Sequence, residues 1–127
     1  HSNIYDPEFV VVVDETLLTA VDVTKGLKED GAIIINSEKS GEELRPLLNG
    51  YKGKVYTIDA RKISVAALGK YFPNMPMLAS IVKVANVMDE ADFLEEMQGS
   101  FKHKFASKPE VIEGNMQALR MALQEVK

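Results

Sequence analysis

Polar side chains that could bind a ligand or a partner protein follow each of three short apolar runs in the sequence. Asp14 and Glu15 follow the first run, Asn36 and Glu38 follow the second, and Asp59 follows the third. Carboxylate and amide groups can ligate a cation, transfer a proton or bind a neighbouring chain. Asp and Asn also follow strands because they satisfy loop amides and cap helices, so turn formation is an alternative role for these residues.

The spacing of these residues completes no catalytic or metal-binding motif. Asp14 and Glu15 are adjacent, so their side chains point in different directions and do not form an acid-base pair. His103 lies between two lysines, whose charges lower its affinity for a cation, and we expect both His103 and His1 to be solvated. The sequence has no cysteine, no Gly-x-Gly-x-x-Gly turn and no phosphate-binding loop. We therefore expect the chain to hold no metal ion or cofactor by itself.

The composition of the 127 residues is typical of a globular domain. Hydrophobic residues make up 46% of the chain and charged residues 27%, which is far from the composition of disordered proteins. A net charge of -4 and a pI near 5.2 provide no basic surface for a phosphate backbone, so nucleic acid is not an expected partner. The apolar runs are far shorter than the ~20 residues of a membrane-spanning helix, so no membrane is expected either. The lack of cysteine fits the reducing cytoplasm, which is the location we expect.

Strands and helices that alternate along the first half must position the polar residues. The apolar runs predict strands at Phe9–Val13, Ala32–Ile35 and Lys54–Ile58, the first two buried on both faces. Helical patterns occur at Leu17–Leu27, at Glu42–Leu48, where Pro46 predicts a distortion, and from Ile63 to Leu68. This order predicts a parallel sheet with right-handed crossovers, in which the polar residues after the strands share one edge. Ligands bind at that edge in open parallel sheets.

The second half of the sequence predicts helices only. Asn74 is expected to cap a helix with Pro76 in its first turn, Asp89–Met97 to form a helix that ends at Gly99, and Pro109 to begin another. We expect these helices to complete one α/β domain over residues 1–127, with a three-layer, mainly parallel, Rossmann-like sheet and flanking helices. The sequence enters a strand within ten residues and has no initiator methionine, which indicates a domain that is incomplete at its N-terminus.

Two segments resemble the gamma subunits of pyruvate and other 2-oxoacid:ferredoxin oxidoreductases. The segment Asp6–Leu18, Asp-Pro-Glu-Phe-Val-Val-Val-Val-Asp-Glu-Thr-Leu-Leu, is similar to the start of the second half of those subunits. Phe72–Leu78, within Lys62–Val84, is similar to the family's Pro-Asn-Thr-Pro-Met-Leu-Gly segment, with Met75 in place of Thr and Ala79 in place of Gly. The resemblance covers nearly the whole chain, but the family's N-terminal Gly-x-Gly-Gln-Gly turn is absent from it. The chain is therefore expected to correspond to the C-terminal two-thirds of the gamma domain.

The resemblance implies a non-autonomous subunit of an oxidoreductase. Such complexes convert a 2-oxoacid, expected here to be pyruvate, and coenzyme A to acyl-coenzyme A and carbon dioxide while they reduce ferredoxin. Thiamine diphosphate, Mg and iron-sulfur clusters are implied on other subunits, which are the expected partners, and ferredoxin and coenzyme A are met through the complex. The gamma component would contribute to assembly and to the active-site and coenzyme A region. The interface candidates are Asp14, Glu15, Asn36, Glu38, Asp59 and Asn74.

The residues by themselves leave two other functions open. A stand-alone nucleotide-binding α/β domain would need a phosphate-binding turn outside this sequence, and nucleotides would then raise its melting temperature. A scaffold domain would bind no small molecule and would copurify with thiamine-binding and cluster-binding subunits.

Overall fold

The computed structural model describes residues 9–127, which form two compact units. The first unit runs to Asp59 and includes Lys127, and the second unit is Ala60–Val126. The solvated position expected for His1, and the part of the family resemblance that precedes Phe9, lie outside the described residues.

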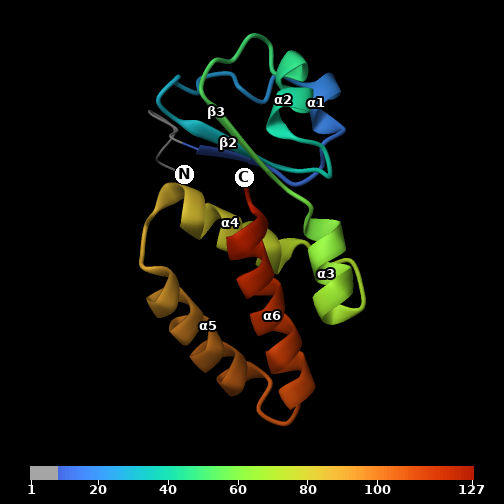
Figure 1. The fold of residues 1–127 in the computed structure, drawn as a ribbon, viewed down its shortest axis with the longest axis vertical. Coiled ribbons are helices and arrows are strands. Elements are labelled where there is room, and N and C mark those ends of the chain that lie inside the picture. Colours follow the sequence, from blue (N-terminus) through green and yellow to red (C-terminus); the bar gives the residue numbers. More distant parts are fainter. Residues whose placement is uncertain (1–8) are drawn as a thin grey trace. The chain divides into compact units, whose positions relative to one another are not determined.

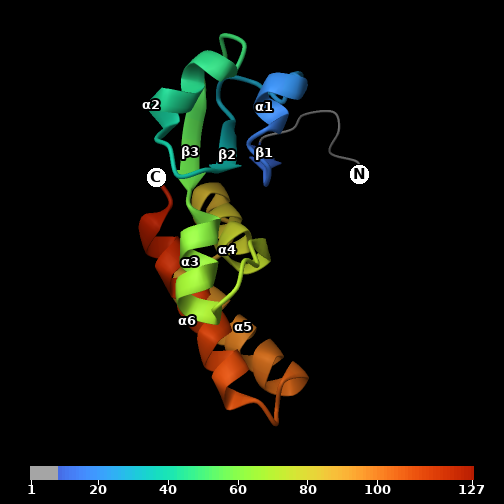
Figure 2. The ribbon, with the colours of Figure 1, turned by 90° about the vertical axis from the view of Figure 1, so that its right-hand side faces the viewer.

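A parallel sheet of three strands forms the first unit. Its strands are β1 (Phe9–Val12), β2 (Ala32–Asn36) and β3 (Lys54–Ile58), in the order β1-β2-β3. Figure 2 shows β2 between its two neighbours. The register places Val12 beside Ile35, and Asn36 beside Ile58. The predicted α/β class, a parallel sheet with flanking helices, is confirmed.

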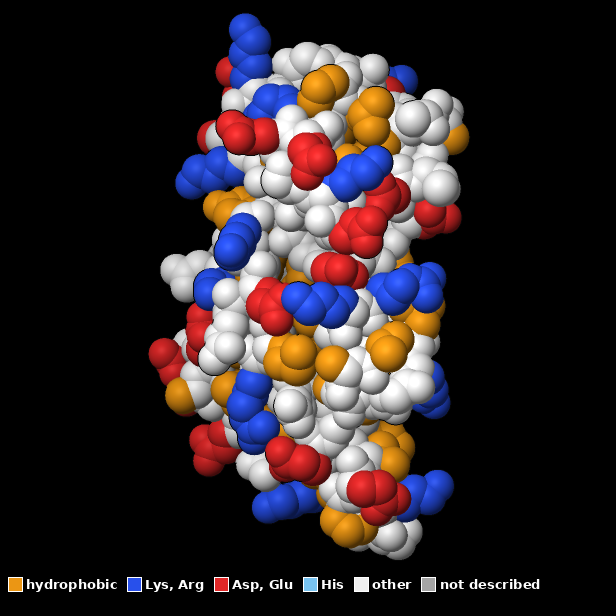
Figure 3. Space-filling model, turned by 45° about the vertical axis from the view of Figure 1, so that its right-hand side comes forward, with side chains coloured by type: hydrophobic (Ala, Val, Ile, Leu, Met, Phe, Trp, Pro, Cys, Tyr) orange, Lys and Arg blue, Asp and Glu red, His pale blue; other side chains and the backbone are white. Residues whose placement is uncertain are grey.

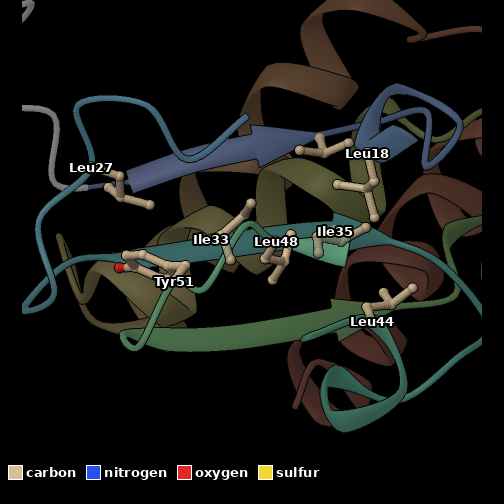
Figure 4. Close-up of a cluster of buried hydrophobic side chains, with 8 residues drawn as sticks. Leu18, Leu27, Ile33, Ile35, Leu44, Leu48 and Tyr51 are labelled. Atoms are coloured by element: carbon tan, nitrogen blue, oxygen red, sulfur yellow. The ribbon is translucent and has the colours of Figure 1, made fainter. Parts of the chain in front are cut away.

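One face of this sheet carries a hydrophobic core. Alternate residues of a strand share a face, so Val12 of β1 lies on the same side as Ile33 and Ile35 of β2. The connecting segments cover these side chains with four large apolar residues and a tyrosine: Leu18, Leu27, Leu44, Leu48 and Tyr51. Figure 4 shows the cluster lying along β2. Burial of these side chains is the main source of stability of the first unit.

The strand β1 is less buried than its sequence predicts. Val11 and Val13 are exposed, so the prediction that Phe9–Val13 is buried on both faces is wrong. Within residues 9–127, β1 pairs with β2 only, and a strand at the edge of a sheet has fewer neighbours to cover it.

The connection between β1 and β2 contains one short helix instead of the long one predicted at Leu17–Leu27. Helix α1 (Leu17–Ala20) ends at Val21, which is extended. The carboxylate of Asp22 then accepts hydrogen bonds from Thr24 N (3.0 Å) and Thr24 Oγ1 (2.7 Å). Such local bonds favour a turn over a helix, which explains why the prediction fails beyond Ala20.

The connection between β2 and β3 agrees with its prediction. Helix α2 (Gly41–Leu44) is followed by the 3-10 helix η2 (Arg45–Leu47), so the helical segment is distorted around Pro46 as expected. Ser40 and Glu43 form a capping box: Ser40 N donates to Glu43 Oε1, and Glu43 N donates to Ser40 Oγ.

Four helices make up the second unit (Figure 1): α3 (Ala60–Leu68), α4 (Asn74–Ala85), α5 (Glu90–Lys104) and α6 (Pro109–Glu125). Helix α6 begins at Pro109 as predicted and packs against the other three. The approach of α3 to α6 is close, because a Cβ on Gly114 would lie 2.9 Å from Ala67 O. None of the described helices is long and apolar enough to span a bilayer.

Helix α5 is longer than predicted. It passes through Gly99, which was expected to end it, and continues to Lys104. The last turn carries Lys102, His103 and Lys104, whose positive charges interact favourably with the carbonyl end of the helix dipole. Packing of Phe93 and Phe101 into the unit holds the helix on both sides of this glycine.

Gly53 provides a test of packing in the first unit. A Cβ at this position would lie 2.1 Å from Tyr51 Oη, which donates a 2.7 Å hydrogen bond to Lys28 O. We predict that Gly53→Ala displaces Tyr51 and lowers the free energy of unfolding by about 1–3 kcal/mol. Gly99→Ala is the matched control, because its Cβ meets no atom within 4 Å and should stabilise α5 by about 0.5–1 kcal/mol. Urea denaturation measures both, and an unchanged stability of the Gly53 variant would contradict the packing described here.

Candidate functional site

Hydrogen bonds tie the carboxyl ends of the three strands into one row. Asn36 Nδ2 donates to Val13 O (3.0 Å), which joins the end of β2 to the end of β1. Ser37 N donates to Ile58 O (3.0 Å), which joins β2 to β3. Asp14, Asn36 and Asp59 therefore lie at one edge of the sheet, as the sequence predicts for a parallel arrangement.

Asp14 forms a tight turn at the end of β1. Its Oδ1 accepts hydrogen bonds from Thr16 N (3.0 Å) and Thr16 Oγ1 (2.7 Å). The bond from the hydroxyl group, followed by the bond from the backbone amide, lowers the pKa of Asp14 below its ordinary value. The exposed carboxylate is therefore ionised near neutral pH and presents a negative charge to a partner.

The loop after β2 is fixed by its own short-range bonds. Ser37 is buried, and its Oγ accepts a 3.0 Å hydrogen bond from Lys39 N. The capping box at Ser40 holds the next turn. Glu38, between these two fixed points, is exposed to solvent, so its charge can be read by a partner without any rearrangement of the loop.

The chemistry available at this row of strand ends is polar contact. Across residues 9–127, no three His, Asp or Glu side chains gather as metal ligands, and no buried side-chain nitrogen or oxygen lacks a hydrogen-bond partner. Ser64 is buried, and it is occupied by bonds to Arg61 O (3.2 Å) and from Phe72 N (3.1 Å). The exposed carboxylates of the row offer hydrogen-bond acceptors and negative charge, which suit a binding surface.

Asn74 belongs to the second unit and does not have its predicted role as a cap. Helix α4 begins at Asn74 itself, with Pro73 in the capping position and no side-chain hydrogen bond there. Asn74 is thus the first helical residue, whereas a capping side chain has to precede the helix. The prediction that Asn74 caps α4 is wrong, although the residue is exposed and lies at the helix start.

Sequence reasoning missed an exposed aromatic pair in the second unit. Tyr71 and Phe72 are exposed in the turn before α4, and the guanidinium carbon of Arg61 lies 4.3 Å from the centre of the Tyr71 ring. The cation–π contact holds this tyrosine in place at the surface. A Tyr-Phe dipeptide beside a proline, between two helical patterns, is the signal that could have identified it.

The face of the molecule in Figure 3 shows no large field of one charge. Lysine and arginine side chains are interspersed with aspartate and glutamate side chains across it. This distribution agrees with the scattered lysines of the sequence and with contacts that are specific to position.

Known proteins show similarity along nearly the whole chain. A family profile described as pyruvate ferredoxin/flavodoxin oxidoreductase matches residues 1–125. "Pyruvate synthase subunit PorC" of Thermotoga maritima is 36% identical over 126 residues, which are 99% of this chain and 64% of that protein. "Pyruvate/ketoisovalerate oxidoreductases common subunit gamma" of Pyrococcus furiosus is 36% identical over 124 residues, which are 98% of this chain and 64% of that protein.

A solved structure agrees with these sequence matches. The crystal structure of pyruvate oxidoreductase subunit PORC from Thermotoga maritima superposes with a TM-score of 0.82 at 34% identity, over 100% of this chain and 67% of that chain. The chain spans slightly less than two-thirds of the length of the two relatives matched by sequence.

The turn at Asp14 leads to a prediction about its pKa. Thr16→Val removes the hydroxyl donor, so the pKa of Asp14 should rise towards its ordinary value of about 3.9. Because the pKa is lowered in the folded chain, the stability that the turn contributes is present above the ordinary pKa and is lost as pH falls through the folded value. Carboxyl-carbon NMR titration measures this shift.

Thr24→Val is the matched control for this titration. The Thr24 hydroxyl group lowers the pKa of Asp22 in the same way, so Thr24→Val should raise the pKa of Asp22 and leave Asp14 unchanged. A Thr16 variant in which Asp14 titrates as before would show that the hydroxyl bond does not control this carboxylate.

The helix starts of the second unit lead to a paired prediction. Asp89 caps α5 by accepting hydrogen bonds from Ala91 N (3.0 Å) and Asp92 N (3.3 Å), so Asp89→Ala should cost about 1 kcal/mol. Asn74→Ala should change the free energy of unfolding by less than about 0.5 kcal/mol, because α4 loses no capping bond. Denaturant unfolding of both variants compares them, and a larger loss at Asn74 than at Asp89 would overturn the assignment.

Proposed function

Because this chain belongs to the pyruvate ferredoxin/flavodoxin oxidoreductase family, we propose that it acts in the gamma subunit of a 2-oxoacid:ferredoxin oxidoreductase. The observation that carries the proposal is the similarity of 99% of the chain to a pyruvate synthase subunit. Pyruvate is the first 2-oxoacid to test, since both relatives matched by sequence carry that word in their names. The chain would act only within a complex, whose products are acyl-coenzyme A, carbon dioxide and reduced ferredoxin.

The chemistry of the reaction would come from groups held by partner subunits. When bound there, thiamine diphosphate with Mg²⁺ would support cleavage of the carbon–carbon bond, and iron-sulfur clusters would carry the electrons to ferredoxin. The present chain has no cysteine to ligate a cluster. What its own residues can supply is a fixed surface for the subunits that hold these groups.

The row of strand ends is the surface that we assign to subunit assembly. Asp14 and Glu38 are exposed, and each is held on a loop that short hydrogen bonds fix in place. Preformed acceptors bind basic and amide side chains of a partner at little cost in conformational entropy. Coenzyme A carries phosphate groups, which these carboxylates repel, so this edge would shape the coenzyme A region through the subunits that it positions. We place the complex in the cytoplasm, where a chain without disulfides is at no disadvantage.

Copurification from the native source tests this function. The chain should be tagged at its N-terminus, because the backbone of Lys127 pairs with Thr57. We predict that it recovers subunits identified by mass spectrometry as thiamine-binding and cluster-binding proteins, and that the recovered complex reduces viologen dye with pyruvate and coenzyme A. The isolated chain should show no such reduction. Recovery of no such subunit, or turnover by the isolated chain, would contradict the proposal.

A pair of substitutions connects the assembly to the row of strand ends. Glu38→Gln removes a charge at the carboxyl ends of the strands, and Asp30→Asn removes an exposed charge before β2, at the amino ends. We expect the first variant to recover less of the complex than the second. Equal recovery would mean that the carboxyl-end row does not contact the partner subunits. A rise in melting temperature with nucleotides, without partner subunits, would instead indicate a stand-alone nucleotide-binding domain.

A further inference from the structure

The two edges of the parallel sheet are finished differently. At the edge of β3, Thr57 N donates to Lys127 O (2.7 Å) and Lys127 N donates to Thr57 O (3.1 Å). At the other edge, β1 has no second neighbour among residues 9–127. Every second residue of a parallel strand directs its N–H and C=O groups to the same side, so half of the backbone groups of β1 face this open edge.

The surface beside the open edge is apolar. Val11 is 36% exposed and Val13 is 46% exposed, and both lie in a run without a charge or a proline. Leu17 and Val21, at the two ends of α1, are exposed as well. Soluble proteins normally protect an edge strand with a charge, a proline or a bulge, so this edge has the chemistry of a strand that is meant to be paired.

A second copy of the chain is a poor partner for this edge. Glu8 precedes the apolar run and Asp14 follows it. Antiparallel pairing of two such runs centred on Val11 would place Glu8 opposite Asp14, and parallel pairing would place Asp14 beside Asp14. Like charges directly opposite each other destabilise a strand pair, so both arrangements are opposed by repulsion.

We propose that the open edge of β1 receives an extended strand from the third of the gamma polypeptide that lies beyond the residues matched here. This inference rests on the proposed function. The matched residues make up 64% of two relatives, so more than enough chain remains in them to supply a strand of about five residues. A strand from the same polypeptide also meets the edge at a high effective concentration, which a separate subunit does not.

The edge also defines the chemistry of the incoming strand. Its backbone pairs with β1, and its apolar side chains on one face extend the surface of Val11 and Val13. The residue next to Asp14 is basic or neutral, because the Asp14 carboxylate is ionised near neutral pH. The sheet then has at least one more strand than residues 9–127 contain.

Site-specific photo-crosslinking of the gamma subunit tests the inference. The sequence has no cysteine, so Val13→Cys gives a single attachment point for a benzophenone maleimide beside the edge. Val65→Cys is the matched control, since Val65 is 48% exposed and lies on α3 of the second unit. After irradiation of the oxidoreductase from the native source, we expect Val13→Cys, and not the control, to capture an apolar peptide of the same gamma polypeptide outside these residues. Capture of another subunit, of a second copy or of no peptide would overturn the inference.

Hydrogen exchange gives a second readout that does not depend on assembly. Alternate amides of β1 should exchange at least tenfold more slowly in the longer gamma subunit than in the chain of 127 residues, whereas amides of β2 should be protected in both. Equal protection of β1 in the two proteins would overturn the inference. Because this measurement needs no partner subunit, it can succeed even where copurification fails, so failures of the two proposals are distinguishable.

Discussion

Burial of β2 is the constraint on which the first unit depends. Ile33, Ile34 and Ile35 are fully buried, and their strand is hydrogen-bonded on both sides. A strand with this much apolar surface cannot remain in water, so the segments before and after it have to supply neighbours and cover. The core leucines, the closed turn at Tyr51 and the alignment of the three strand ends all follow from that requirement.

The strongest patterns in the sequence predicted the sheet well. Three β-branched runs separated by helical segments gave the strands and their common direction, because burial and crossover geometry act in the same sense. Predictions failed where a few hydrogen bonds or one packed side chain decide between alternatives. Asp22 ended a helix that the periodicity continued, and packing carried α5 through Gly99. Neither effect has a periodic signature in the sequence.

The row of strand ends was predictable as a location, and its details were not. Parallel strands have to place Asp14, Asn36 and Asp59 at one edge, so sequence order alone was sufficient to find it. That Asn36 bonds to Val13 O, and that Thr16 controls the charge on Asp14, depends on distances below 3.1 Å that no spacing rule provides. The exposed Tyr71 depends on a contact with Arg61 from another turn of the chain.

The pairing of Lys127 with Thr57 makes the first unit discontinuous along the chain. During synthesis, β3 leaves the ribosome well before Lys127, with all four helices of the second unit still to be made. The outer edge of β3 therefore stays open until those helices have emerged and brought the end of the segment back to the sheet. Contacts of such long sequence separation form late and slow the folding of a domain. The first unit is thus expected to complete its folding only after the second has formed, although its strands are synthesised first.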